Sequence, residues 1–205
     1  MATVDPVKDH PELYKGKAEW VRVSVPERVV IAVDGTGDPN TSSSYANALA
    51  ALYGIAYTAK FALKKAGRDD FKVAPLEGLW WADDYAAFME TTDKNAWNWT
   101  IFIPVPEFVT ADDIEAAREA VAKKHPEIDY SKVERRSYAE GDCVQYFWVG
   151  PYDQEAEVLL PLHQGGLEAM GLVENGHHHE VYLNDPRRTA PEKLKTVLRQ
   201  PVRPR

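Results

Sequence analysis

The sequence has few of the features that define special classes of protein. Cys143 is the single cysteine among 205 residues, so an internal disulfide and a cysteine-based zinc site are excluded. No apolar run reaches the roughly 18 residues that a membrane-spanning helix needs. The first 16 residues are polar and lack the apolar segment of a secretory signal. We therefore expect a soluble, cytoplasmic protein that needs no cofactor.

Basic residues are also scarce. The chain has 24 lysines and arginines against 32 aspartates and glutamates, which gives a formal net charge of −8. Such a surface repels phosphate backbones, and no segment reads as a helix-turn-helix, so nucleic acid is not an expected partner. Hydrophobic residues make up 44% and charged residues 27%, which is typical of a folded globular protein and excludes a disordered one. Aromatic residues, at 11%, are plentiful.

Hydrophobic periodicity predicts two similar halves. Each half has the order strand, helix, strand, strand: 28–33, 45–65, 72–81 and 97–105 in the first, and 143–149, 154–170, 178–183 and 196–202 in the second. A further strand is expected at 133–138. The sequence thus predicts an α+β fold of two duplicated units with antiparallel sheets and a ligand groove between the halves. We expect an N-terminal arm (1–26) and one domain (27–205), with repeats at about 27–106 and 132–203 and a linker helix at 110–124.

Several familiar motifs are incomplete in this sequence. Gly35 and Gly37 lack the third glycine of a dinucleotide site and the Gly-Lys-Ser/Thr of a phosphate-binding loop. His177, His178 and His179 lie in a predicted strand, where neighbours point to opposite faces, so a metal site is not expected. Cys143 has apolar neighbours typical of a core residue. No Gly-x-Ser-x-Gly motif indicates a serine hydrolase.

The segment 178–183 contains the strongest candidate for chemistry. Strand alternation places His178, Glu180 and Tyr182 on one face. Burying an ionised carboxylate without a partner costs several kcal/mol, on the order of 3–5 in practice. Glu180 is therefore paired, protonated, or held for a ligand or a reaction. A pairing with Arg187 or Lys195 is the structural alternative.

Aromatic residues favour the ligand interpretation. They recur at strand or helix spacing, and such residues are usually part of a core. Together with one carboxylate on a matching strand they indicate a pocket for flat, apolar and often cationic ligands, which rings attract by stacking and cation–π interactions. The aromatic candidates are Tyr53, Tyr57, Trp80, Trp81, Tyr146 and Trp148.

Several segments resemble the stand-alone GyrI-like small-molecule-binding proteins, whose domain also forms the drug-sensing part of some bacterial transcription regulators. The resemblance covers about residues 20–203. Its most specific parts are Pro75-Leu-Glu-Gly-Leu-Trp-Trp81 and Glu180-Val-Tyr-Leu-Asn-Asp-Pro-Arg-Arg188, with Gly150-Pro-Tyr-Asp153 as a weaker match. The resemblance implies the duplicated fold and a glutamate at the place of Glu180 deep in the groove. One departure is Trp148, where members of the subgroup often have a histidine.

The resemblance also implies an activity, because some stand-alone members look like hydrolases that open the strained cyclopropane of DNA-alkylating natural products and so detoxify them. In this hypothesis Glu180 accepts a proton from the attacking water, and Tyr182 or Tyr53 donates to the substrate's carbonyl oxygen. The remaining candidates, Trp80, Trp81, Tyr57, Tyr146 and Trp148, bind the rings. The alternative is non-catalytic binding of cationic or amphipathic aromatic ligands, and a third interpretation is action on a protein partner.

Overall fold

The computed structural model describes residues 3–82 and 94–205. Two compact units divide the chain. Unit 1 comprises Met1–Asp9 and Glu27–Tyr138, and unit 2 comprises His10–Pro26 and Ala139–Arg205. The N-terminal segment that the sequence suggests as a separate arm therefore contributes residues to both units.

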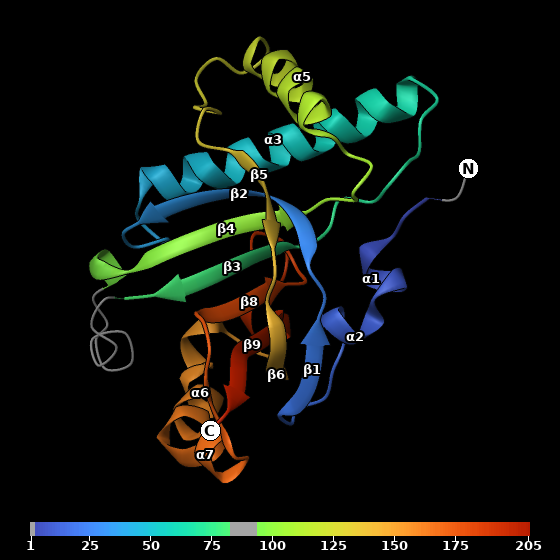
Figure 1. Cartoon of the computed structure of the whole chain (residues 1–205). Helices are drawn as coiled ribbons and strands as arrows, with labels where there is room; N and C mark the ends of the chain where they lie inside the picture. The colour runs from blue at the N-terminus through green and yellow to red at the C-terminus, as the bar shows by residue number, and fades with distance from the viewer. Residues whose placement is uncertain (1–2, 83–93) are drawn as a thin grey trace. The chain divides into compact units, whose positions relative to one another are not determined.

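Unit 1 is built on an antiparallel sheet in the order β3-β4-β2-β5. The long helix α3 runs beside this sheet, and α5 packs against α3 (Figure 1). The strands are β2 (Arg28–Thr36), β3 (Leu76–Trp81), β4 (Asn98–Pro104) and β5 (Glu134–Tyr138). The helices are α1 (Pro6–Asp9), α3 (Ser43–Lys65), α5 (Ala111–Ala122) and the short 3-10 turn η1 (Lys94–Ala96).

Local sequence signals explain where the two main helices begin. The Ser42 side chain accepts a hydrogen bond from the backbone N–H of Tyr45 at the start of α3. Thr110 and Asp113 form a reciprocal capping box at the start of α5, which satisfies donors that a helix leaves unpaired. Both helices are confirmed close to their predicted bounds. None of the described helices is long and apolar enough to cross a membrane.

The two faces of the unit 1 sheet carry different side chains. Trp99 and Ile101 on β4 are buried, and Trp99 meets Tyr45 of α3 edge to face at 5.1 Å between ring centroids. The opposite face holds a cluster of Val30, Ala32, Leu79 and Phe102, with Trp81 and Tyr138 packed against it. Alternate residues of each strand point to opposite faces. Both faces of this sheet therefore carry buried side chains.

Gly35 illustrates how closely α3's side of the sheet is packed. It lies opposite Trp99 in the β2–β4 pairing, and a Cβ at Gly35 would lie 2.2 Å from Cη2 of that indole. We expect Gly35→Ala to lower the free energy of unfolding by about 1–3 kcal/mol, because the ring must shift to admit a methyl group. Urea denaturation measures this, with Thr36→Ala at the neighbouring exposed position as control. Equal stability of both variants would contradict the packing.

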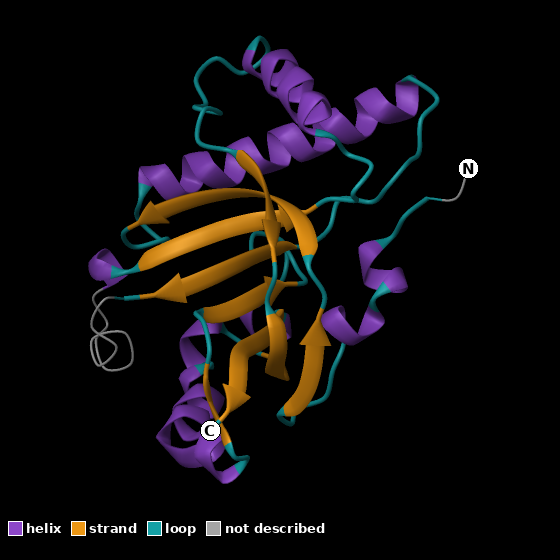
Figure 2. Ribbon diagram, viewed as in Figure 1, coloured by secondary structure: helices purple, strands orange, loops and turns teal. Residues whose placement is uncertain are grey.

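The strands of unit 2 are antiparallel in the order β1-β6-β9-β8, and β7 pairs with the far end of β9. Its helices are shown in purple beside the orange strands in Figure 2. The strands are β1 (Val21–Val25), β6 (Gly141–Val149), β7 (Leu172–Glu174), β8 (His178–Tyr182) and β9 (Lys195–Pro204). The short helix α2 (Pro11–Tyr14) and the 3-10 turn η4 (Pro191–Lys193) belong to the same unit.

The strands of the two units share one topology. In unit 1 the first strand (β2) pairs with the last (β4), which pairs with the middle one (β3). In unit 2 the corresponding strands are β6, β9 and β8, paired in the same way. The predicted α+β fold with a duplicated strand–helix–strand–strand order is confirmed.

The prediction of one continuous helix at 154–170 is wrong. The structure has a 3-10 turn η2 (Tyr152–Gln154), α6 (Ala156–Pro161), a π-helical turn η3 (Leu162–Gly166) and α7 (Leu167–Ala169). Pro161 lacks the N–H that would bond to the preceding turn. Gly165 has a φ of 137°, which only glycine adopts easily. The spacing of apolar residues predicted neither break, and it did not predict the short strand β7.

Candidate functional site

Register in unit 2 gathers the predicted residues of this unit on one face of the sheet. Tyr146 on β6 lies opposite Leu198 on β9, which lies opposite Glu180 on β8. One step along, Trp148, Thr196 and Tyr182 form a second row. Directly opposed residues point to the same side of a sheet. This surface, called here the Glu180 face, therefore combines one carboxylate with hydroxyl and aromatic groups.

Glu180 is held by two neighbours from its own strand. The Tyr182 hydroxyl donates to Glu180 Oε2 at 2.6 Å, and His178 Nε2 lies 3.2 Å from Glu180 Oε1. The side chain of Glu180 is 15% exposed and that of His178 is 6% exposed. Each carboxylate oxygen thus meets a polar group of β8 in a largely desolvated position, where electrostatic interactions are strong.

Tyr152 of η2 approaches the same face. Its ring meets that of Tyr182 edge to face at 5.7 Å between centroids. Burial raises the pKa of the Tyr152 phenol, and the negative charges of Glu180, Glu155 and Asp185 raise it further. Tyr152 therefore keeps its proton at neutral pH and presents a hydrogen-bond donor.

Aromatic rings border the Glu180 face. Trp20, which immediately precedes β1, packs against Tyr146 with 5.4 Å between ring centroids. The Trp148 indole donates from Nε1 to the Pro151 carbonyl at 3.1 Å. Gly150 has a φ of 155°, and a Cβ there would lie 3.0 Å from the Trp148 ring. The glycine of the Gly-Pro-Tyr segment therefore leaves room for this indole.

The other predicted aromatic residues belong to unit 1. Trp80 is buried against Tyr45 and Trp97, whereas Trp81 is half-buried against the apolar cluster on the opposite face. Tyr53 and Tyr57 stack on α3 at 6.3 Å between centroids, and Tyr57 is 46% exposed. The predicted residues of unit 1 therefore do not form one group, because Trp80 and Trp81 lie on opposite faces of the sheet.

The three histidines of the segment 177–179 do not point to one place. His178 lies on the Glu180 face, while His179 points to the other side of β8 and bonds to Glu140. Partial desolvation by its surroundings lowers the pKa of His177, although the residue as a whole is exposed. Arg187, one of the two basic partners considered for Glu180, makes a two-point contact with Asp185 at 2.9 Å.

The comparisons with known proteins place these observations in a family. The model of the GyrI-like small molecule binding domain matches residues 22–203. The chain belongs to the GyrI-like family. Three similar solved structures come from Listeria innocua: an uncharacterized conserved protein (40% identity, TM-score 0.90), a hydrolase encoded by lin2189 (38%, 0.88) and a hydrolase (39%, 0.85). Each alignment covers 98% of this chain and 100% of the relative. No curated protein matches significantly.

Sequence reasoning missed three polar residues of the Glu180 face in this GyrI-like protein. They are Tyr152, Thr196 and, as a functional candidate, His178. His178 lies two residues before Glu180 in the same strand, so strand alternation alone places it on the Glu180 face. Thr196 could be found only from the β8–β9 register, and Tyr152 only from the turn that returns η2 to the sheet.

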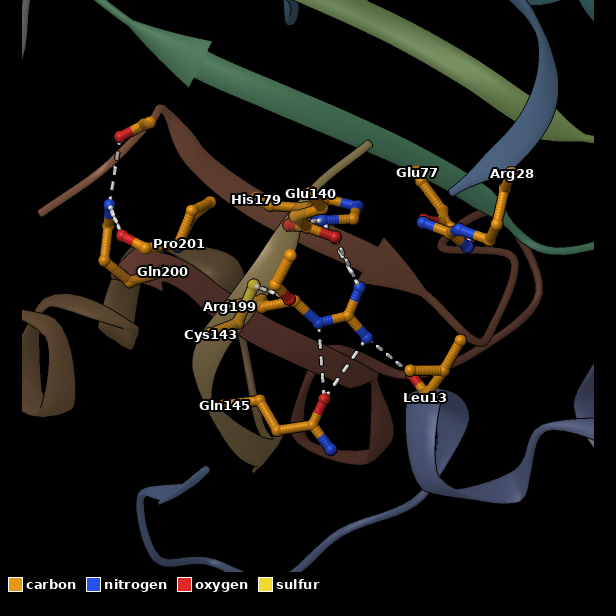
Figure 3. A network of polar contacts seen from close by, with 12 residues as sticks. Leu13, Arg28, Glu77, Glu140, Cys143, Gln145, His179, Arg199, Gln200 and Pro201 are labelled. Carbon is orange, nitrogen blue, oxygen red and sulfur yellow. Dashed lines mark hydrogen bonds and ion pairs between the residues drawn. The ribbon is translucent and has the colours of Figure 1, made fainter. Parts of the chain in front are cut away.

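The opposite face of the same GyrI-like sheet holds a buried ionic network (Figure 3). His179 Nδ1 lies 2.6 Å from Glu140 Oε1, and Arg199 Nη1 donates to Glu140 Oε2 at 3.2 Å. Arg199 also donates to the Gln145 side chain and to the Leu13 carbonyl. The network thus joins three strand segments to α2, and it packs the back of the sheet that carries Glu180.

Proposed function

We propose that this protein hydrolyses the strained cyclopropane of flat aromatic, DNA-alkylating compounds and so detoxifies them. The observation that carries the proposal is the position of Glu180, largely desolvated, bonded by Tyr182 and in one row with Tyr146. Membership of a small-molecule-binding family supports a ligand of this size. The two similar proteins described as hydrolases support a reaction rather than binding alone.

The reaction needs few catalytic groups, because ring strain in the substrate supplies part of the driving force. In this proposal the rings of Trp20, Tyr146 and Trp148 hold the substrate by stacking. The Glu180–His178 pair takes the proton of the water that attacks the ring carbon. Bringing water and substrate together in a desolvated site lowers the barrier further.

The substrate's carbonyl oxygen gains charge as the ring opens and needs a hydrogen-bond donor. The Tyr182 hydroxyl already donates to Glu180. Tyr152, which keeps its proton, and Thr196, which lies between Trp148 and Tyr182 in register, are better placed for this role. The predicted contributions of Tyr53, Tyr57, Trp80 and Trp81 remain part of the proposal, and single substitutions to alanine or phenylalanine would test them.

The test of the proposed function is product formation. We expect the purified protein to convert a cyclopropane-bearing aromatic alkylator to its water adduct, seen by chromatography and mass spectrometry. Protection of DNA from alkylation in the same mixture would give a second readout. Release of unchanged compound after prolonged incubation with excess protein would contradict hydrolysis.

Non-catalytic binding is the second candidate function, and the same aromatic border of the Glu180 face favours it. In that case a stable cationic aromatic dye would quench the fluorescence of Trp20 and Trp148, while no strained compound would be turned over. Glu180 would then act as a counter-ion for the ligand's positive charge.

A further inference from the structure

Two polar atoms on the Glu180 face are buried and have no hydrogen-bond partner within the described part of the chain. They are His178 Nδ1 and Thr196 Oγ1. His178 is 7% exposed and Thr196 is fully buried. A buried polar atom without a partner carries a desolvation cost, so native proteins rarely leave one without a reason. Beside a candidate reaction centre, a polar group of the substrate or a water molecule would supply the missing partner.

The contact between His178 and Glu180 determines which ring nitrogen of His178 carries the proton. Glu180 Oε2 accepts from Tyr182, and Glu180 Oε1 faces His178 Nε2. An ionised carboxylate can only accept hydrogen bonds, so Nε2 must carry the proton in this contact. With the proton on Nε2, the lone pair of the imidazole ring is on Nδ1. That atom is a base without a competing hydrogen bond.

We propose that His178 Nδ1 is the proton acceptor of the reaction and that Glu180 acts through it. This assignment rests on the proposed hydrolytic function of the Glu180 face. Glu180 fixes the imidazole tautomer and stabilises the imidazolium that forms, which is the role of the carboxylate in a carboxylate–histidine pair. Both oxygens of Glu180 already meet a polar group of β8, Oε2 the Tyr182 hydroxyl and Oε1 the His178 imidazole.

The step balances with water as the second reactant. The water oxygen bonds to a cyclopropane carbon as one ring C–C bond breaks, and the electron pair moves to the conjugated carbonyl oxygen. The water proton passes to His178 Nδ1. That proton then moves to the new oxyanion, directly or through solvent, so the neutral histidine returns and the product contains one added water.

His178→Gln is the discriminating variant. Glutamine keeps an N–H that can reach Glu180 but has no basic atom. We expect kcat to fall by about 100-fold or more, while KM and quenching by a stable dye change by less than about threefold. Imidazole added to His178→Gly should restore part of the activity. His177→Gln, at the exposed neighbouring position, is the control and should retain wild-type kcat. Near-normal kcat in His178→Gln would overturn the assignment and leave the proton with Glu180.

A second measurement needs no substrate. In protein labelled with ¹⁵N-histidine, the signals absent from His178→Gln identify His178, and their shifts report which nitrogen is protonated. We expect the Nε2–H tautomer in the wild type and a mixture in Glu180→Gln. A proton on Nδ1 in the wild type would overturn the assignment even if the enzyme is active. A wild-type protein that binds the strained compound without turnover would overturn the proposed function and the assignment together.

Discussion

Glu180→Gln is expected to lower kcat for the strained substrate by about 10²–10⁴-fold, the usual contribution of acid–base groups. Glutamine matches the carboxylate in shape but has no charge. Its amide has only one acceptor oxygen, so it cannot accept from both His178 and Tyr182 as the two carboxylate oxygens do, and the support for the tautomer that leaves Nδ1 basic is weakened. Single-turnover product formation, followed by chromatography with enzyme in excess, measures the chemical step directly.

Glu157→Gln provides the matched control for this experiment. Glu157 is an exposed residue of α6, so the same loss of charge there should leave kcat unchanged. Quenching by an uncharged flat aromatic compound should survive in Glu180→Gln, which separates lost chemistry from lost binding. Turnover equal to that of the wild type would remove Glu180 from the mechanism.

Arg199→Met is expected to lower the free energy of unfolding by about 3–5 kcal/mol, since it removes the arginine that balances the charge of the buried Glu140 carboxylate. The side chains of Arg199 and Glu140 are both fully buried, with 3.2 Å between Nη1 and Oε2. Arg199 also donates to the Leu13 carbonyl at 2.8 Å. The variant should therefore loosen α2 as well, and faster amide exchange at residues 12–14 would show this alongside urea denaturation.

Two further variants test the origin of that loss. Arg188→Met removes an arginine whose side chain is 86% exposed, and it should change stability by less than about 0.5 kcal/mol. Glu140→Gln in the Arg199→Met background should recover part of the loss, because it removes the buried carboxylate charge that has lost its arginine. If Arg199→Met and Arg188→Met were equally stable, the network would contribute nothing to folding.

Strand alternation made much of unit 2 predictable. A period of two along β8 puts His178, Glu180 and Tyr182 on one face, and the structure shows the bonds between them. Capping residues such as Thr110 and Ser42 likewise placed the helix starts. These signals are local, and each depends on residues within four positions in the chain.

Predictions failed where the deciding contact is distant in sequence. Arg199 receives its acceptors from residues 54, 59 and 186 positions away, and no spacing rule links them. The aromatic residues Tyr53 and Tyr57 fit a helical stripe, but periodicity could not tell that Tyr57 would be 46% exposed. Burial depends on which other element covers a face.

The sequence by itself determined the order of elements, the duplicated topology and the face on which Glu180 lies, because these depend on periodicity and on capping within a few residues. Only the tertiary structure decided which groups surround that carboxylate. Register between β6, β9 and β8 placed Trp148, Thr196 and Tyr146 on the face of Glu180, and the turn after Gly150 brought Tyr152 to Tyr182. Pairing between strands is a long-range choice, made by packing rather than by any one segment.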